Sequence, residues 1–410
     1  MRLILAILLT LSLGIPAISM AQSSPTEFPA ATADQQARFA AWRDGFRTRA
    51  LGNGVPAALF DSAFRGRGFN TEVAYRDANQ AEFRRAIWDY LDRAVSDTRI
   101  TNGRRLARRN ARTLRAIESR FPVDSQVVMS IWGMESNYGA VRGDIPVVEA
   151  LGTLATQGRR RSWAERELMN VFRILGNGDV APRNLTGSWA GAMGHTQFMP
   201  SSYLAYARDL SGDGRRDVWG NNPADALASA ANYLAENGFQ RGAPIVHEVL
   251  LPAGFDFALV DGETRNSAGF WAGLGVRRAE GALYSGAPFA LWAPAGGRGP
   301  VFAIYPNFQV IKRYNNADSY ALAVGLLADR INGAGPLLAA WPRDERPLSA
   351  AEIVEIQTIL ARLGYAPGTA DGLMGPNTRN AIRGFQSAKG LLSDGEPTVA
   401  LLALLRQEAG

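Results

Sequence analysis

The sequence predicts a mainly α protein of the α+β class, with a small inserted antiparallel β subdomain and a separate three-helix module at the C-terminus. Apolar residues recur at helical spacing over most of residues 22 to about 240. The period then changes, and short apolar segments separated by glycine and proline run from about 243 to 310. The charged, proline-bracketed stretch W-P-R-D-E-R-P at 341–347 reads as a linker before residues 348–410.

The N-terminus has the pattern of a secretory signal peptide, which we assign to residues 1–21. Met1-Arg2 precedes an apolar run from Leu3 to Ile18, and Ser19-Met20-Ala21 is a small-x-small cleavage pattern. A retained anchor helix is the alternative, but the run is short for a membrane span. The sequence has no cysteine, which excludes disulfides, Cys-zinc sites and a lipidated cysteine. We therefore expect a soluble exported protein with no membrane anchor after cleavage.

The charge balance favours acidic partners. The formal net charge is +6 and the isoelectric point is about 9.8. The run of arginines from Arg104 to Arg115 has the 3–4 spacing of a solvated helix face. Because no nucleic-acid recognition motif occurs, the expected polyanion is cell-envelope material and not nucleic acid.

The helices and strands follow from these periods and from their capping residues. Before the β subdomain, helices are expected at Asp34–Arg49, Glu72–Val95, Ile100–Arg120, Val123–Asn137, Arg161–Gly176 and Pro223–Asn237. Strands are expected within I-V-H-E-V-L-L at 245–251, A-P-F-A-L-W-A at 287–293 and V-F-A-I-Y at 301–305, and a helix returns at Ser319–Asn332. The first module therefore places its sheet late in the chain, after most of its helices.

A lone carboxylate stands out in S-I-W-G-M-E-S-N-Y-G-A, from Ser130 to Ala140. Glu135 follows an apolar helical run, and the previous charged residue is Asp124. A carboxylate in such surroundings needs a partner, becomes protonated, or performs chemistry that uses a raised pKa. On spacing alone, a structural glutamate paired with an arginine is the more common case.

Two further stretches carry residues suited to binding a long polar ligand. One is G-S-W-A-G-A-M-G-H-T-Q-F-M-P-S-S-Y from Gly187 to Tyr203, whose small residues would let a ligand approach the backbone closely. The other is R-Y-N-N-A-D-S-Y from Arg313 to Tyr320, where tyrosine and asparagine could stack on a sugar and hydrogen-bond to it. His195 and His247 are the only histidines, which weakens any histidine-metal or Ser-His-Asp interpretation.

Four motifs in one order carry a resemblance that covers about Phe39 to Arg330. They are S-I-W-G-M-E-S-N-Y-G, G-A-M-G-H-T-Q-F-M-P-S-S-Y, S-G-D-G-R-R-D-V-W and K-R-Y-N-N-A-D-S-Y-A-L-A-V. This region resembles the membrane-bound lytic transglycosylase B family. The resemblance implies a lysozyme-like fold and cleavage of the β-1,4 bond between N-acetylmuramic acid and N-acetylglucosamine in peptidoglycan, leaving a 1,6-anhydro end.

The resemblance also assigns roles to residues. It implies that Glu135 is the catalytic acid, and that a basic pair, Arg160 and Arg161, meets acidic stem peptides. The implied substrate contacts are Tyr90, Ser188, Gln197, Phe198, Tyr233, Tyr314, Asn315 and Tyr320. Without the resemblance, the tyrosines at helical spacing would be read as core residues. Family members are often lipoproteins, so the missing cysteine implies a form free in the periplasm, with peptidoglycan strands as the partner and no protein partner identified.

The chemistry of one carboxylate is consistent with this reaction. Glycosidases usually use two carboxylates. One suffices if Glu135 first protonates the leaving oxygen and then takes the proton of the muramic C6 hydroxyl as that hydroxyl attacks C1, which requires neither water nor a cofactor. Asp144 and Glu149 are the nearby alternatives for a second carboxylate, read here as a loop cap and helix surface. A hydrolytic muramidase on the same fold and an inactive wall-binding scaffold therefore remain as alternatives.

A candidate calcium loop lies in D-L-S-G-D-G-R-R-D, from Asp209 to Asp217. Asp209, Ser211 and Asp213 stand at loop positions 1, 3 and 5, glycine at position 6 and Arg215 at position 7, as in an EF-hand. Position 12 is Gly220 and not glutamate, and the resemblance implies that Asp225 can complete the set instead. A plain turn rich in aspartate is the alternative reading, so structural calcium is a candidate and not a requirement.

After the linker, residues 348–410 resemble a small helical peptidoglycan-binding module. Ile356 to Leu391 contains L-G-Y, D-G-x-x-G, T-x-x-A and F-Q in order. Apolar residues of the first helix, with Ile382 and Phe385 of the next, form a small core. Such a module would tether the catalytic unit to an insoluble polymer and raise the local substrate concentration. A dimerising helical tail is the alternative.

Overall fold

The computed structural model describes residues 28–79 and 86–410, so the predicted signal peptide lies outside the described residues. The described part is mainly helical with small antiparallel sheets, which confirms the predicted fold class. Within these residues, no helix combines the length and the apolar character that a membrane crossing demands. Four hydrophobic cores organise residues 28–79 and 86–410.

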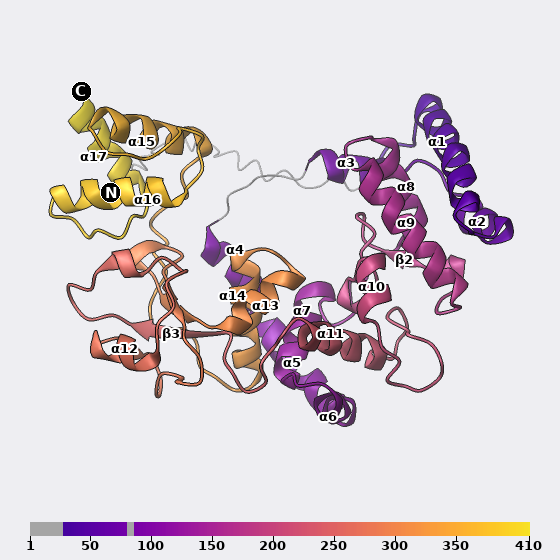
Figure 1. Ribbon diagram of the computed structural model, residues 1–410, viewed down its shortest axis with the longest axis horizontal. Coiled ribbons are helices and arrows are strands. Elements are labelled where there is room, and N and C mark those ends of the chain that lie inside the picture. The colour runs from indigo at the N-terminus through magenta and orange to yellow at the C-terminus, as the bar shows by residue number, and fades with distance from the viewer. Residues whose placement is uncertain (1–27, 80–85) are drawn as a thin grey trace, which may run out of the picture.

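The first core joins the N-terminal helices to the helices that follow the Glu135 motif, on the right of Figure 1. A capping box begins the first helix: the Thr32 hydroxyl accepts from the Gln35 N–H, and the Gln35 side chain accepts from the Thr32 N–H. The helices of this core are α1 (Ala33–Gly52), α2 (Ala57–Phe64), α3 (Thr71–Ala78), α8 (Val147–Thr156), α9 (Arg161–Gly176) and α10 (Pro200–Tyr206). Residues distant in sequence therefore share one core.

The second core lies at the centre of Figure 1 and holds the helix of Glu135. Its helices are α4 (Ile87–Ala94), α5 (Asp97–Arg109), α6 (Ala111–Arg120), α7 (Ser125–Ser136), α11 (Ala224–Glu236), α13 (Pro306–Tyr314) and α14 (Asp318–Ile331). Two helices that the sequence predicts as continuous are interrupted, which corrects the prediction. The helix from Glu72 ends at Ala78, and the helix through Ile100 breaks at Asn110, whose side chain donates to the Leu106 carbonyl (2.9 Å).

The inserted β subdomain has its own core beneath a four-stranded antiparallel sheet in the order β4-β3-β6-β5. The strands are β3 (Val246–Leu250), β4 (Arg277–Arg278), β5 (Ala290–Trp292) and β6 (Val301–Ile304), and the subdomain also holds η3 (Phe257–Leu259), α12 (Ala268–Gly273) and η4 (Gly296–Arg298). β3, β5 and β6 lie where the sequence predicts strands. In β3, Val246 pairs with Ile304 and Val249 with Val301.

A two-stranded pair in the helical body was not predicted. β1 (Ile145–Pro146) pairs antiparallel with β2 (Thr186–Gly187). In the chain, β2 lies between the 3-10 helices η1 (Pro182–Asn184) and η2 (Gly194–Thr196). The approach is close, since a Cβ on Gly143 would lie 2.2 Å from the Gly187 carbonyl. This pair fixes the Gly187–Tyr203 stretch beside the loop that follows Glu135.

The C-terminal module has a separate core formed by α15 (Ala350–Arg362), α16 (Pro376–Ala388) and α17 (Val399–Ala409). The segment 341–347 before it has no helix or strand, yet it packs on the body: Arg343 forms two 2.8 Å hydrogen bonds with Asp92. Asp394 of the module accepts from the Gly297 N–H (2.9 Å) of the β subdomain. The module is thus in direct contact with the β subdomain, at the upper left of Figure 1.

Candidate active site

Glu135 lies in the last turn of α7, where the backbone turns sharply. Asp124 occupies the N-cap position, but its carboxylate accepts from the Gly242 N–H (2.8 Å) and does not cap the helix. At the other end, Asn137 (φ 48°) and Tyr138 (φ 59°) are both left-handed. Two such non-glycine residues in succession are strained and persist only where their surroundings hold them, which is typical of functional sites.

Hydrogen bonds to His195 hold this turn in place. The Ser136 hydroxyl donates to the His195 carbonyl (2.7 Å) and accepts from the Gly139 N–H (2.9 Å). The Trp132 indole donates to His195 Nδ1 (3.0 Å), so Nε2 carries the proton that bonds to the Gly220 carbonyl (2.8 Å). Burial lowers the pKa of His195. This histidine is therefore a neutral support of the turn.

The carboxyl group of Glu135 faces tyrosines. The Tyr320 hydroxyl, from α14, donates to Glu135 Oε1. Desolvation by burial raises the pKa of Glu135 to about 7, although the Tyr320 hydrogen bond acts in the opposite direction. Tyr90 of α4 is also near, because burial and the Glu135 charge together raise the pKa of its hydroxyl to about 12. Glu135 is thus a carboxyl group that holds its proton near neutral pH.

Tyr314, Phe198 and Tyr233 form an aromatic cluster beside these groups. The Tyr314 hydroxyl donates to the Thr196 carbonyl (2.7 Å), and burial together with the negative charge of Glu135 raises the pKa of Tyr314. The Tyr314 ring centroid lies 4.8 Å from that of Tyr233 and 5.8 Å from that of Phe198. The structure therefore brings the Gly187–Tyr203 and Arg313–Tyr320 stretches together around α7.

The glycine-rich stretch is shaped mainly by contacts with the protein itself. A Cβ on Gly187 would lie 2.2 Å from the Ala192 carbonyl, and one on Gly194 would lie 2.1 Å from the Val218 carbonyl. The Ser188 hydroxyl accepts from the Ala192 N–H (3.2 Å), and left-handed Gln197 donates to the Arg142 carbonyl (3.0 Å). Glycine is therefore required at these two positions by the close approach of the chain to itself.

The remaining predicted site residues do not contact Glu135 or the aromatic cluster in the hydrogen bonds and ion pairs of the described residues. Arg160 pairs with Asp77 (3.4 Å) and Arg161 with Glu165 (3.3 Å), at the start of α9. Asn315 is exposed at the end of α13. Of the two alternative carboxylates, Asp144 is exposed, and Glu149 accepts from the Asn70 side chain (2.8 Å). Neither of these carboxylates is among the groups that shift the pKa of Glu135.

The candidate calcium loop brings three carboxylates together. Oxygens of Asp209, Asp213 and Asp225 lie within 4.8 Å of one another. Asp225 is buried at the start of α11, and desolvation raises its pKa. Its carboxylate also accepts from the N–H groups of Ser211 (3.0 Å) and Asp217 (3.0 Å), which closes the loop. Like charges at this separation fit a divalent cation with oxygen ligands.

Comparison with protein families shows to which family residues 38–329 are related. The model of the "Transglycosylase SLT domain" family matches residues 38–329. The chain belongs to this family. The SLT domain so defined includes α7, the aromatic cluster and the whole β subdomain. A second family model, "Putative peptidoglycan binding domain", matches residues 349–405, which hold α15, α16 and α17.

Individual relatives agree with this assignment. "Membrane-bound lytic murein transglycosylase B" of Escherichia coli is 33% identical over 217 residues, which are 52% of this chain and 58% of that protein. SltB3 from Pseudomonas aeruginosa, solved with NAG-anhNAM-pentapeptide, superposes with a TM-score of 0.83 at 46% identity, covering 90% of this chain and 99% of SltB3. The E. coli lytic transglycosylase Slt35 in complex with calcium gives 0.60 at 27% identity, over 71% of this chain and 92% of Slt35.

Proposed function

We propose that this SLT-domain protein is a lytic transglycosylase that cleaves the β-1,4 bond between N-acetylmuramic acid and N-acetylglucosamine and forms a 1,6-anhydromuramic end. The observation that carries the proposal is the environment of Glu135. Among the described residues, burial and the Tyr320 hydroxyl are the influences on its pKa, and no second carboxylate contributes. The relative SltB3 was solved with NAG-anhNAM-pentapeptide, and we extend a peptidoglycan ligand of that kind to this chain.

The proposed reaction uses Glu135 twice. The protonated carboxyl group gives its proton to the leaving glycosidic oxygen, and the resulting carboxylate then accepts the proton of the C6 hydroxyl as that oxygen attacks C1. The buried site favours return of the proton to Glu135, which restores the starting state. We further propose that Tyr90, Ser188, Gln197, Phe198, Tyr233, Tyr314, Asn315 and Tyr320 contact the glycan, and that Arg160 and Arg161 meet acidic peptide groups. The direct test is release of soluble fragments from purified peptidoglycan.

The pH dependence of the rate follows from the state of Glu135. The first step needs the protonated form, which predominates below a pKa of about 7, so the rate should fall as the pH rises through about 7. The Tyr320 hydrogen bond lowers this pKa, and Tyr320→Phe should therefore move the alkaline limb of the profile to higher pH. Rates on soluble glycan chains between pH 5 and 9 (about two units either side of the pKa) check this. A limb that stays in place or moves to lower pH would contradict the assignment.

We propose that calcium, when bound, is held by side-chain oxygens of Asp209, Ser211, Asp213 and Asp225 and by the backbone carbonyl of Arg215, where it would neutralise clustered charge and stabilise the loop. Slt35, whose structure contains calcium, motivates the identity of the ion. Adding calcium should raise the melting temperature by a few degrees, because a ligand that binds only the folded state stabilises it. A chelator should reverse the rise, and Asp213→Asn should remove it, whereas Asp34→Asn at an exposed ion pair should not. An equal response in all three proteins would argue for a plain turn.

We propose that residues 348–410 bind peptidoglycan and that 341–347 connect them to a catalytic unit of residues 22–340. The two helical cores and the core of the β subdomain include no residue after Trp341. This supports a separable C-terminal module. A protein ending at Arg346 should cleave soluble chains at a rate close to that of the full chain, and sediment less with insoluble peptidoglycan. Equal sedimentation, or loss of activity on soluble chains, would refute this division.

We also propose that the protein acts in the periplasm as a soluble enzyme after removal of residues 1–21. The support is the signal pattern together with the absence of a cysteine for lipid attachment. Cell fractionation tests this proposal: the protein should leave the cell with the soluble periplasmic contents, and recovery only in detergent extracts would contradict it.

A further inference from the structure

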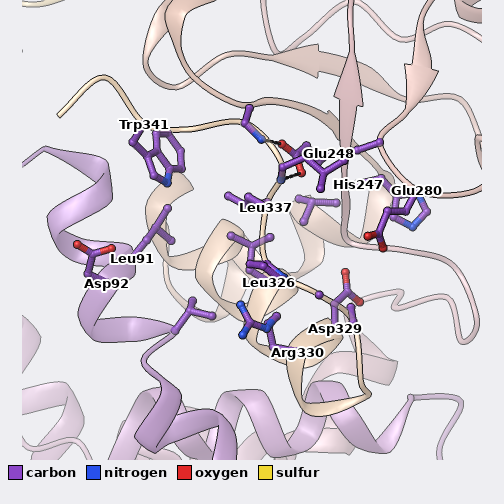
Figure 2. Close-up of a pocket in the computed structure, with 18 of the residues that line it drawn as sticks. Leu91, Asp92, His247, Glu248, Glu280, Leu326, Asp329, Arg330, Leu337 and Trp341 are labelled. Carbon is purple, nitrogen blue, oxygen red and sulfur yellow. Dashed lines mark hydrogen bonds between the residues drawn. The ribbon is translucent and has the colours of Figure 1, made fainter. Parts of the chain in front are cut away.

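A cavity lies away from Glu135, between α4, β3, α14 and the segment 334–341 that follows α14. Its volume is about 580 Å³, a size usual for ligand sites, and none of the predicted active-site residues lines it. Figure 2 shows Leu91 and Trp341 on one side and Asp329, Glu280 and His247 on the other, with Leu326 and Leu337 between. The end near Asp329, Glu280 and His247 is polar and the middle is apolar, whereas Asp92 lies beside Leu91 at the other end.

The wall made by the 334–341 segment is fixed by hydrogen bonds. Glu248 of β3 accepts from the backbone N–H groups of Leu338 (2.8 Å) and Ala339 (2.7 Å), drawn as dashed lines in Figure 2. The Trp341 ring lies 6.2 Å from that of Trp88. Glu248 is therefore occupied in holding the wall, and the cavity is formed before any ligand arrives.

Other charges at the polar end lack close partners. No ion pair within 4.0 Å is found for Arg278, Glu280 or Asp329 among the described residues. Asp329 is exposed to solvent, yet desolvation by the surrounding atoms raises its pKa to about 6, even though Arg278 acts to lower it. Arg330 lies 3.8 Å from the fully exposed Asp97, and its buried Nε has no hydrogen-bond partner. His247 is neutral, because burial lowers its pKa to about 4.

We propose that this cavity binds a small zwitterion of the amino-acid or short-peptide type, with its carboxylate toward Arg278 and Arg330, its ammonium toward Asp329 and Glu280, and an apolar side chain toward Leu326 and Leu337. Guanidinium groups suit carboxylates because their donors form a planar fork. A simple anion would meet Asp329 and Glu280, and a simple cation would meet two guanidinium groups. A ligand with both charges would pair with both sets of groups.

The site is independent of glycan cleavage, so its test does not use activity. Calorimetry with the full chain should show binding of the tripeptide Ala-Leu-Ala with free termini. N-acetylation, which removes the ammonium, and C-terminal amidation, which removes the carboxylate, should each weaken binding about tenfold or more, equivalent to at least about 1.4 kcal/mol. Failure of the full chain to bind the free tripeptide at millimolar concentration would overturn the proposal.

Variants locate the binding. Asp329→Asn and the exposed Glu280→Gln should lose discrimination against the acetylated peptide, and Arg278→Gln should lose discrimination against the amide. Asp34→Asn and Arg38→Gln, at an exposed ion pair on α1, are matched controls that should bind as the wild type does. Because Glu280 is exposed, its variant keeps the test valid if another variant is unstable. Wild-type discrimination in all three cavity variants would refute the site.

Discussion

Glu135→Gln is expected to abolish bond cleavage and to leave the fold and peptidoglycan binding unchanged. Glutamine can keep a hydrogen bond to Tyr320 but can neither give nor take the proton, and general acid-base catalysis contributes roughly 10²–10⁴-fold. Because the proposed reaction uses Glu135 in both steps, we expect a loss of at least about 10³-fold. The measurement is the initial rate of fragment release from soluble glycan chains, with melting temperature as the check on folding.

The matched control is Asp144→Asn, which alters an exposed carboxylate in the loop after the same helix. It should retain most of the wild-type rate. If Glu135→Gln kept even about a tenth of that rate, Glu135 would not be the acid and base. A loss of similar size in Asp144→Asn would instead indicate a second catalytic carboxylate and a hydrolytic route.

Gly139→Ala should be among the most destabilising single substitutions near the site. Gly139 has φ +82°, and an added Cβ would lie 2.3 Å from His195 Cε1. The substitution combines backbone strain with a clash against the residue that supports the turn, and we expect a loss of about 3 kcal/mol or more in the free energy of unfolding. Displacement of the turn should also lower activity, because it carries Glu135.

Gly158→Ala separates the clash from the strain. Gly158 has a nearly identical φ of +87°, but no atom lies within 4 Å of its added Cβ. It should cost only the strain of a left-handed alanine, about 1 kcal/mol. Urea unfolding of both variants gives the comparison, and equal losses would show that the His195 contact does not constrain the turn.

Local features of the fold were predictable from sequence because they depend on near neighbours. The apolar period located α1, α7, α9, α11 and α14, and glycine and proline separated the three longer strands. The breaks at Asn79 and Asn110 were missed, since asparagine disfavours a helix only slightly and a continuous apolar period concealed both ends. The β1-β2 pair was missed because two residues per strand carry no alternation signal.

The site shows the same division. The apolar surroundings of Glu135 predicted a raised pKa, in agreement with the value of about 7. Its contact with Tyr320 joins residues 185 positions apart, so only the family resemblance could relate the two stretches. The supporting role of His195 was missed as well. It depends on Trp132 and Ser136, which lie about 60 positions earlier in the sequence. The sequence offered no signal beyond the presence of these residues in the Ser130–Ala140 and Gly187–Tyr203 stretches.

The identity of the new sugar end tests the central claim most directly. Purified peptidoglycan is digested in ¹⁸O-labelled water, and the muropeptides are weighed by mass spectrometry. Because the C6 hydroxyl of the substrate replaces water in the proposed reaction, each product should carry a 1,6-anhydro end, lighter by one water than the hydrolysed form and free of label. Reducing ends that contain ¹⁸O would show that water attacks C1, and would make the protein a hydrolytic muramidase.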